Sequence, residues 1–238
     1  MRKYLKAEYV TNGRLALLLQ RLAEYAASDK WGSTRSCLGC LLFFVGMAFF
    51  PVGPIVGLVI FFYYARYDTE DRRYQVPTQL LQAMSSQLDP QKDMLMRVDF
   101  RESKADPFIT ARTDGNPRVT EYSHNWLELQ MYTPRGQRLA VKITRQGKEV
   151  VRGTGKSQTT EHTFVDVAAM SLENFDRGTR QATALAVPDS GKFSRLTAAT
   201  TGAAVAIEGV GAASGPGGNG VGFDGNDLAV LFEFALKQ

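Results

Sequence analysis

Apolar residues change their spacing twice along the chain, and each spacing predicts a different kind of element. Over residues 14–28, leucines recur three and four residues apart with charged residues between them, which predicts an amphipathic helix. Residues 37–65 then contain no Lys, Arg, Asp, Glu, His, Asn or Gln. Beyond residue 90, apolar and polar residues alternate, which is typical of half-buried strands.

The uncharged run at residues 37–65 predicts membrane attachment. Its core, residues 41–62, would be ~33 Å long as a helix, close to the ~30 Å hydrocarbon core of a bilayer. Pro51, Gly53 and Pro54 lie near the middle of this core. We therefore expect one kinked transmembrane helix. The alternative is a re-entrant hairpin that returns both ends to one side, because each half of the run is too short to cross.

Small residues and cysteines give this run some candidate chemistry. Gly53 and Gly57 form a GxxxG pair, which permits close helix packing in lipid. Cys37 and Cys40 are candidates for lipid modification beside a membrane. Their CxxC spacing does not indicate a redox or zinc site, because no further Cys or His lies nearby. The alternative is that both pairs are ordinary small residues packed in an apolar segment.

The chain beyond the run predicts a β-rich domain over residues 77–238. After a polar linker at 66–76, Pro77 begins a short helix that ends near residue 88. Strands are predicted at 94–100, 127–131, 139–143, 148–152, 160–170, 192–199, 202–209 and 228–236. Turn residues at 133–137 and 146–147 separate neighbouring strands, and residues 209–227 form a flexible glycine-rich loop. The expected fold is a membrane-anchored α+β protein whose domain is a mainly antiparallel β-sandwich or open barrel.

Charge is concentrated in the basic N-terminal arm, residues 1–36. This arm holds seven basic and three acidic residues, whereas residues 37–238 hold 21 of each. A domain without net positive charge excludes a nucleic-acid partner. The surplus in the arm favours attraction to anionic headgroups of a lipid bilayer. With the apolar run, it predicts a bacterial inner-membrane location and a cytoplasmic N-terminus.

No catalytic, metal or cofactor motif is complete in the sequence. Residues 152–157 approach a phosphate-binding loop, but Val150 stands where that motif needs its first glycine, so a basic hairpin loop is favoured. The two histidines, His124 and His162, are too few for a histidine-rich metal centre. Asp99, Arg101 and His124 remain as an alternative polar pocket. We expect no cofactor and no bound metal.

Residues 94–170 resemble a set of uncharacterised bacterial proteins. The resemblance is carried by LMRVDFR at 95–101, HNWLELQ at 124–130, PRGQRL at 134–139 and GTGKS at 153–157. In those proteins the loop around 145–160 is usually more basic. The resemblance implies strands and hairpin turns and no activity.

These features predict a non-catalytic accessory or scaffold subunit of a membrane protein assembly. Its apolar segment would anchor it beside other membrane-protein subunits, and its β-domain would dock on one of them. The alternatives are a membrane-tethered enzyme or small-ligand-binding domain, and a lipid-surface sensor that uses the basic arm.

Overall fold

The computed structural model describes residues 6–47, 52–65, 70–153, 157–173, 180–185, 192–202, 204–211 and 223–237. Nine strands form one sheet with the order β1-β2-β4-β5-β6-β9-β8-β7, and β3 also pairs with β4. Every pairing is antiparallel. The strands are β1 (Glu8–Gly13), β2 (Met94–Asp99), β3 (Ile109–Thr113), β4 (Arg118–Tyr132), β5 (Arg138–Arg152), β6 (Thr159–Glu173), β7 (Arg180–Leu185), β8 (Phe193–Gly202) and β9 (Ala204–Gly211). The helices are α1 (Leu15–Met47), α2 (Val52–Ala65), α3 (Arg72–Ala83) and α4 (Gly225–Lys237), with a 3-10 turn at Asp106–Phe108.

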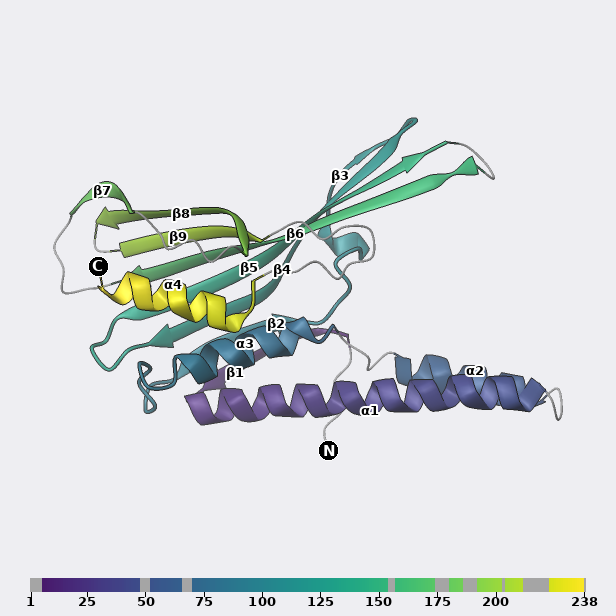
Figure 1. The fold of residues 1–238 in the computed structure, drawn as a ribbon. Helices are drawn as coiled ribbons and strands as arrows, with labels where there is room; N and C mark the ends of the chain where they lie inside the picture. The colour runs from purple at the N-terminus through teal and green to yellow at the C-terminus, as the bar shows by residue number, and fades with distance from the viewer. Residues whose placement is uncertain are drawn as a thin grey trace.

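A single layer of helices covers one face of the sheet (Figure 1). It consists of the first half of α1, then α3, then α4. The predicted helix at 14–28 is confirmed, and its leucines Leu18 and Leu22 are fully buried against the sheet. Leu80 of α3 and Phe232 of α4 complete the same core. The helical spacing of these side chains places them on one face of each helix, and burying a Leu or Phe contributes about 1.5–3 kcal/mol.

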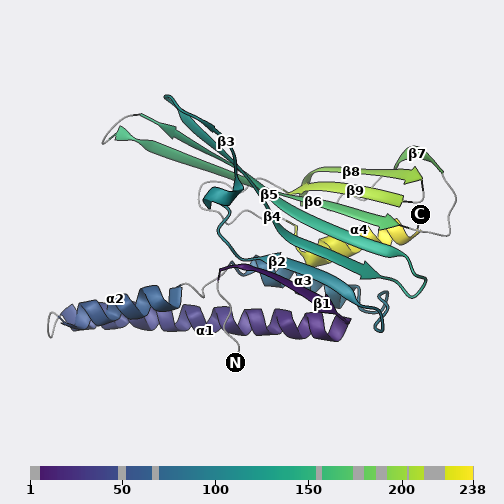
Figure 2. The ribbon, with the colours of Figure 1, turned by 180° about the vertical axis from the view of Figure 1, so that it is seen from behind.

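The sheet extends beyond its helical layer as a long arm. β4, β5 and β6 have 15 residues each, so each strand is about 50 Å long at ~3.3 Å per residue. One half of each lies over the helices, and the other half projects with β3 (Figures 1 and 2). The register of β4 and β5 shifts at Trp126. This bulge reverses which side chains point inward: His124 is buried before it and Leu127 after it.

The apolar run folds as two helices and not as one. The second half of α1 and the whole of α2 lie antiparallel, side by side, and project away from the sheet (Figures 1 and 2). Pro54 lies in the first turn of α2, where its missing N–H has no partner to lose. Because the chain reverses before this turn, the apolar residues are shared between two short segments. No helix in the described part of the chain is both long and apolar enough to cross a membrane.

The prediction of one kinked transmembrane helix is therefore wrong. The placement of the chain in a bacterial inner membrane, with a cytoplasmic N-terminus, was based on that span and is corrected with it. The length of the apolar run alone predicted a span, because 22 consecutive apolar residues would reach across a bilayer if they formed one helix.

The predicted β-sandwich or open barrel is also wrong. The structure has one open sheet with helices on one face. One reason is that residues 228–236, predicted as a strand, lie in α4. Asp224 and Asp227 begin this helix as a reciprocal cap: the Asp227 carboxylate accepts from the Asp224 N–H at 2.7 Å, and the Asp224 carboxylate accepts from the Asp227 N–H at 3.1 Å.

Most of the other predicted strands are confirmed, with one difference in β5. The turn at 133–137 joins β4 to β5, with Gly136 at a φ of 79°. The turn predicted at 146–147 is absent, because β5 continues through it. Gly147 is needed there because the Phe164 ring of β6 lies directly over its Cα, in the space a Cβ would occupy. Glycine thus indicated a close cross-strand contact and not a turn.

Candidate functional site

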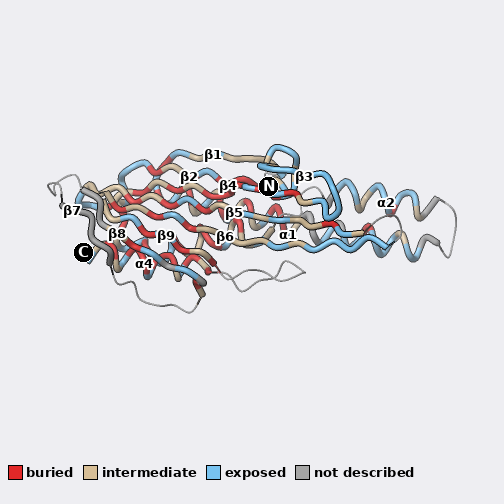
Figure 3. The backbone as a smooth tube through the Cα atoms, turned by 90° about the horizontal axis from the view of Figure 1, so that it is seen from above, coloured by how far each residue is buried: buried red, intermediate tan, exposed pale blue. Residues whose placement is uncertain are grey.

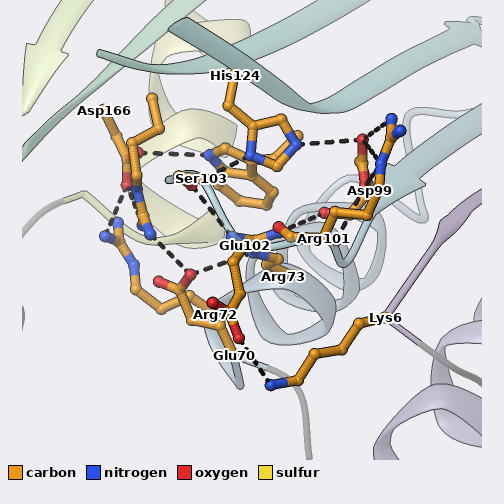
Figure 4. Close-up of polar contacts among 12 residues, drawn as sticks. Lys6, Glu70, Arg72, Arg73, Asp99, Arg101, Glu102, Ser103, His124 and Asp166 are labelled. Atoms are coloured by element: carbon orange, nitrogen blue, oxygen red, sulfur yellow. Dashed lines mark hydrogen bonds and ion pairs between the residues drawn. The ribbon is translucent and has the colours of Figure 1, made fainter. Parts of the chain in front are cut away.

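The apolar core ends where the helical layer stops, and charged and polar side chains lie at this boundary. Three strands contribute a row at this boundary: His124 of β4, Arg145 of β5 and Asp166 of β6, with His124 opposite Arg145 and Arg145 opposite Asp166. The loop after α2 and the start of α3 add Glu70, Arg72 and Arg73. Figure 4 labels five of these side chains, which meet between the sheet and α3: His124, Asp166, Glu70, Arg72 and Arg73. We call this set, with Asp99, Arg101, Ser103 and Trp126, the polar cluster.

Asp166 is the acceptor at one end of the polar cluster. Its side chain is 4% exposed. It accepts from Arg72 Nη1 at 2.8 Å, from Arg145 Nε at 2.9 Å and Nη2 at 3.1 Å, and from Trp126 Nε1 at 3.4 Å. Burial alone would lower the pKa of Arg145, but its bonds with Asp166 and Glu70 outweigh burial and raise it. Arg145 therefore stays charged, and the buried carboxylate stays paired.

Arg73 lies at the centre of the cluster and connects α3 to the loop after β2. Its guanidinium donates to Glu70 at 3.1 Å, to the Asp99 carbonyl at 2.6 Å and to the Arg101 carbonyl. Burial lowers the pKa of Arg73. Burial likewise raises the pKa of Glu70, but the bonds from Arg145 and Arg73 outweigh it, so the net pKa is lowered. Glu70 therefore holds two arginines from different elements together.

The other end of the cluster contains the three residues expected in a polar pocket. The structure does bring Asp99, Arg101 and His124 together. Asp99 accepts from Arg101 Nη2 at 2.6 Å, and its Oδ2 lies 3.2 Å from His124 Nε2. Arg101 also reaches Glu8 of β1 at 3.2 Å. Burial raises the pKa of Asp99, but the contacts with His124 and Arg101 outweigh it and hold that pKa well below its usual range.

Ser103, His124 and Asp99 form a hydroxyl–imidazole–carboxylate chain. Arg73 can only donate, so Ser103 Oγ accepts from Arg73 Nη2 at 3.2 Å. The ionised Asp99 faces Nε2 of His124, which favours the tautomer whose Nδ1 accepts the Ser103 hydrogen at 3.1 Å. In this tautomer the single N–H of the neutral ring lies on Nε2, facing Asp99, although its alignment falls short of a hydrogen bond. Burial lowers the pKa of His124, which keeps the ring neutral.

This chain has the residue types of a nucleophilic triad but not its access. His124 is fully buried and stacks on Phe108 at 3.7 Å between ring centroids. Ser103 is 8% exposed, and its oxygen is already occupied by Arg73. A catalytic hydroxyl must be able to reach a substrate carbonyl. The arrangement therefore serves as a clamp that positions the loop after β2.

The remaining predicted site residues that the structure describes lie on the helical hairpin formed by the second half of α1 and by α2. Pro51 is outside the described residues. Gly53 and Pro54 are in the first turn of α2, and Cys37 and Cys40 are exposed free thiols on α1. Exposed thiols are accessible to lipid modification, which stays a prediction.

Gly57 packs on α1, where it lies against Gly39 and Phe43. A Cβ at Gly39 would lie 2.5 Å from the Phe61 N, and one at Gly57 would lie 2.5 Å from the Phe43 N. The two backbones touch, which only glycine permits.

Much of the hairpin is exposed (Figure 3), and the exposed side chains around this contact form an apolar surface. We call it the hairpin surface; its exposed side chains are Leu38, Leu41, Leu42, Phe44 and Val45 of α1 and Ile55, Val56, Leu58, Val59, Phe62 and Tyr63 of α2. Phe44 is 66% exposed and Phe62 is 68% exposed. Elsewhere in the described residues, the large apolar side chains that are exposed are isolated ones such as Val10 and Val230.

Sequence reasoning missed most of the polar cluster. The sequence pattern places Glu70, Arg72 and Arg73 in a linker, Arg145 in the connection before the turn at 146–147, and Asp166 at an ordinary strand position. One signal was available for Asp166: it interrupts the apolar run of a predicted strand, where an acid needs a partner. Its partners come from segments 21 and 94 residues away, and no local pattern identifies them.

The conclusions about function depend on this geometry alone, because comparison with protein-family models, curated proteins and solved structures finds no match.

Proposed function

We propose that the protein is a non-catalytic accessory or scaffold subunit that is anchored by its helical hairpin and docks on the other subunits of an assembly through its sheet. The hairpin surface supports this proposal more than any other feature. Eleven apolar side chains are exposed on it. If each exposes about half of its area, they form a patch of roughly 1,000 Å², larger than the ~300–600 Å² of the largest apolar patch on a typical monomer.

Such a subunit would contact its partner proteins through the sheet and the helices that cover it, which we call the sheet domain. The face of the sheet opposite the helices has a shallow hollow of about 650 Å³, lined by small side chains such as Ala169, Ala199 and Ala206. Glu128, Lys142 and Glu208 line it as well. Small side chains leave room for a partner's side chains, and the charges provide orientation.

Site-specific photocrosslinking of the full chain in its native cells tests this proposal. A photoreactive residue at Ala206 should give a defined protein adduct, and one at Val230, on the outer side of α4, should not. Val230 is the matched control because it is 51% exposed and lies outside both surfaces. A chain that gives no adduct from Ala206 and remains a monomer in mild detergent would contradict the scaffold function.

A second candidate function, hydrolysis by a tethered enzyme, is favoured only by the Ser103–His124–Asp99 chain. It requires Ser103 to become accessible. A fluorophosphonate probe should then label wild-type protein and not Ser103→Ala. Absence of labelling in the wild-type protein would exclude this candidate and favour the clamp.

A further inference from the structure

We propose that the hairpin surface inserts into one leaflet of a lipid bilayer without crossing it. The inference names the partner of the attachment surface and depends on the proposed function only for the role of the hairpin. Four observations support lipid as the occupant: how far the apolar surface extends around the hairpin, how its two helices pack, its length, and the side chains at its base.

The apolar surface extends around both helices. At about 100° per residue, the exposed side chains of α1 cover about 160° of its circumference, and those of α2 cover about the same. The remaining sides face each other through Gly39 and Gly57. A single groove or sheet face of a protein would cover one side of the hairpin and leave the other in water. Acyl chains surround it on every exposed side.

The packing between the two helices supports the same conclusion. The backbones of α1 and α2 touch where Gly39 meets Gly57 and Phe61. In lipid, an apolar side chain gains little by packing on another helix, because the acyl chains around it are equally apolar. Close backbone contact through small residues is therefore what holds helices together. Here the large side chains point outward and the glycines inward, which is the reverse of a water-soluble helical hairpin.

The length of the apolar surface matches one leaflet. From Leu38 to Val45, the surface extends ~12 Å along α1, and from Ile55 to Tyr63 it extends ~14 Å along α2. Half of a ~30 Å hydrocarbon core is ~15 Å. The hairpin therefore fills one leaflet and returns, which agrees with the finding that no described helix could span a membrane.

The base of the hairpin has the residues typical of a membrane–water boundary. Trp31, Lys30 and Arg35 lie on α1 just before the apolar surface, with the Arg35 Cζ 6.0 Å from the centre of the Trp31 ring. Because Gly39 contacts Gly57 and Phe61, the antiparallel pairing places Tyr63 near the level of Arg35. Tryptophan, tyrosine and basic residues concentrate at headgroup level. They set the depth at which insertion stops.

Flotation of the full chain with lipid vesicles tests the insertion. The vesicles contain phosphatidylcholine with about one third phosphatidylglycerol. Wild-type protein should float with them, and Phe44→Asp/Val59→Asp should bind at least about 100-fold more weakly, because each carboxylate would enter the hydrocarbon region. Val10→Asp and Val230→Asp are matched controls at exposed apolar positions outside the hairpin and should bind as the wild type does.

Tryptophan probes test the depth. Phe44→Trp should be quenched most by lipids brominated near the ends of their acyl chains, and Phe62→Trp by lipids brominated near the headgroup. Trp31 and Trp126 give the same background in both variants. Protease added outside the vesicles should remove the sheet domain completely.

Three outcomes would overturn the proposal. The first is flotation that Phe44→Asp/Val59→Asp leaves unchanged. The second is a sheet domain protected inside the vesicles. The third is a wild-type chain that does not float and forms a soluble oligomer, which the double substitution dissociates. In that case a second copy of the chain, and not lipid, covers the hairpin surface. The scaffold function fails separately, through the photocrosslinks at Ala206.

Discussion

Removing the charge of Asp166 should destabilise the protein far more than removing a surface acid. Asp166→Asn leaves Arg145 and Arg72 without the carboxylate to which both donate, in a site where the Asp166 side chain is 4% exposed. Removing one partner of a buried ion pair costs about 3–5 kcal/mol. Arg72 is 29% exposed and Arg145 keeps Glu70. Both reduce the cost, so we expect about 3 kcal/mol.

Urea unfolding followed by circular dichroism measures this free energy. The matched control is Glu173→Gln, which removes a pair with Arg138 at 2.7 Å on the surface, where the two side chains are 38% and 30% exposed. An exposed pair of this kind contributes about 0–1 kcal/mol. Both substitutions exchange a carboxylate for an amide, so the difference between them reports burial and pairing.

A double substitution separates pairing from burial. Asp166→Asn/Arg145→Met removes both charges of the pair and should recover part of the stability lost in Asp166→Asn. The account would be refuted if Asp166→Asn cost no more than Glu173→Gln. It would also be refuted if the double variant were less stable than the two single effects summed.

Four further predictions concern glycines and pH. Gly39→Val should separate α1 from α2, because its Cβ would lie 2.5 Å from the Phe61 N; hydrogen exchange of α2 amides should accelerate strongly, and Leu42→Val, on the exposed side, should leave it unchanged. Gly147→Val should displace the Phe164 ring and cost about 1–3 kcal/mol, seen as a lower thermal midpoint than that of Ser123→Val. As pH falls below about 6.5, stability should decrease, because the unfolded chain protonates His124 while burial lowers the pKa of that ring in the fold; His124→Asn should remove this dependence. A second loss should begin below about pH 4.5, because the folded-state pKa values of Glu70 and Asp99 are lowered, so these carboxylates contribute stability only while ionised.

Alternating patterns located strands well, since alternation reflects burial on one face of a sheet. The same rule failed at residues 228–236, where nearly every residue is apolar and period two cannot be separated from period 3.6. Leu228, Leu231 and Phe232 are the buried set, at helical spacing. The Asp224 and Asp227 cap before the run was the signal that would have decided for a helix.

The candidate site was only partly predictable for a different reason. Asp99 and Arg101 are neighbours along the chain, so their contact is local. His124 joins them only because the bulge at Trp126 turns it inward. Glu70 and Asp166 meet Arg145 through strand register and helix placement, which a single sequence does not specify. Similarly, the apolar run located the helical hairpin, but whether it formed one helix or two depended on the contact between Gly39 and Gly57.

The continuity of α1 has a mechanical consequence. One 33-residue helix runs from the hairpin into the core, so a pull on the hairpin along that axis reaches Leu18, Leu22 and Tyr25 with no compliant joint between. The load is applied in shear: these buried side chains must slide together past the sheet, and they cannot be peeled off one at a time. The return path through α2 carries load as well, because Arg72 and Arg73 fasten the chain a few residues after that helix ends. The domain is thus held by two parallel tethers, an arrangement that resists torque as well as tension.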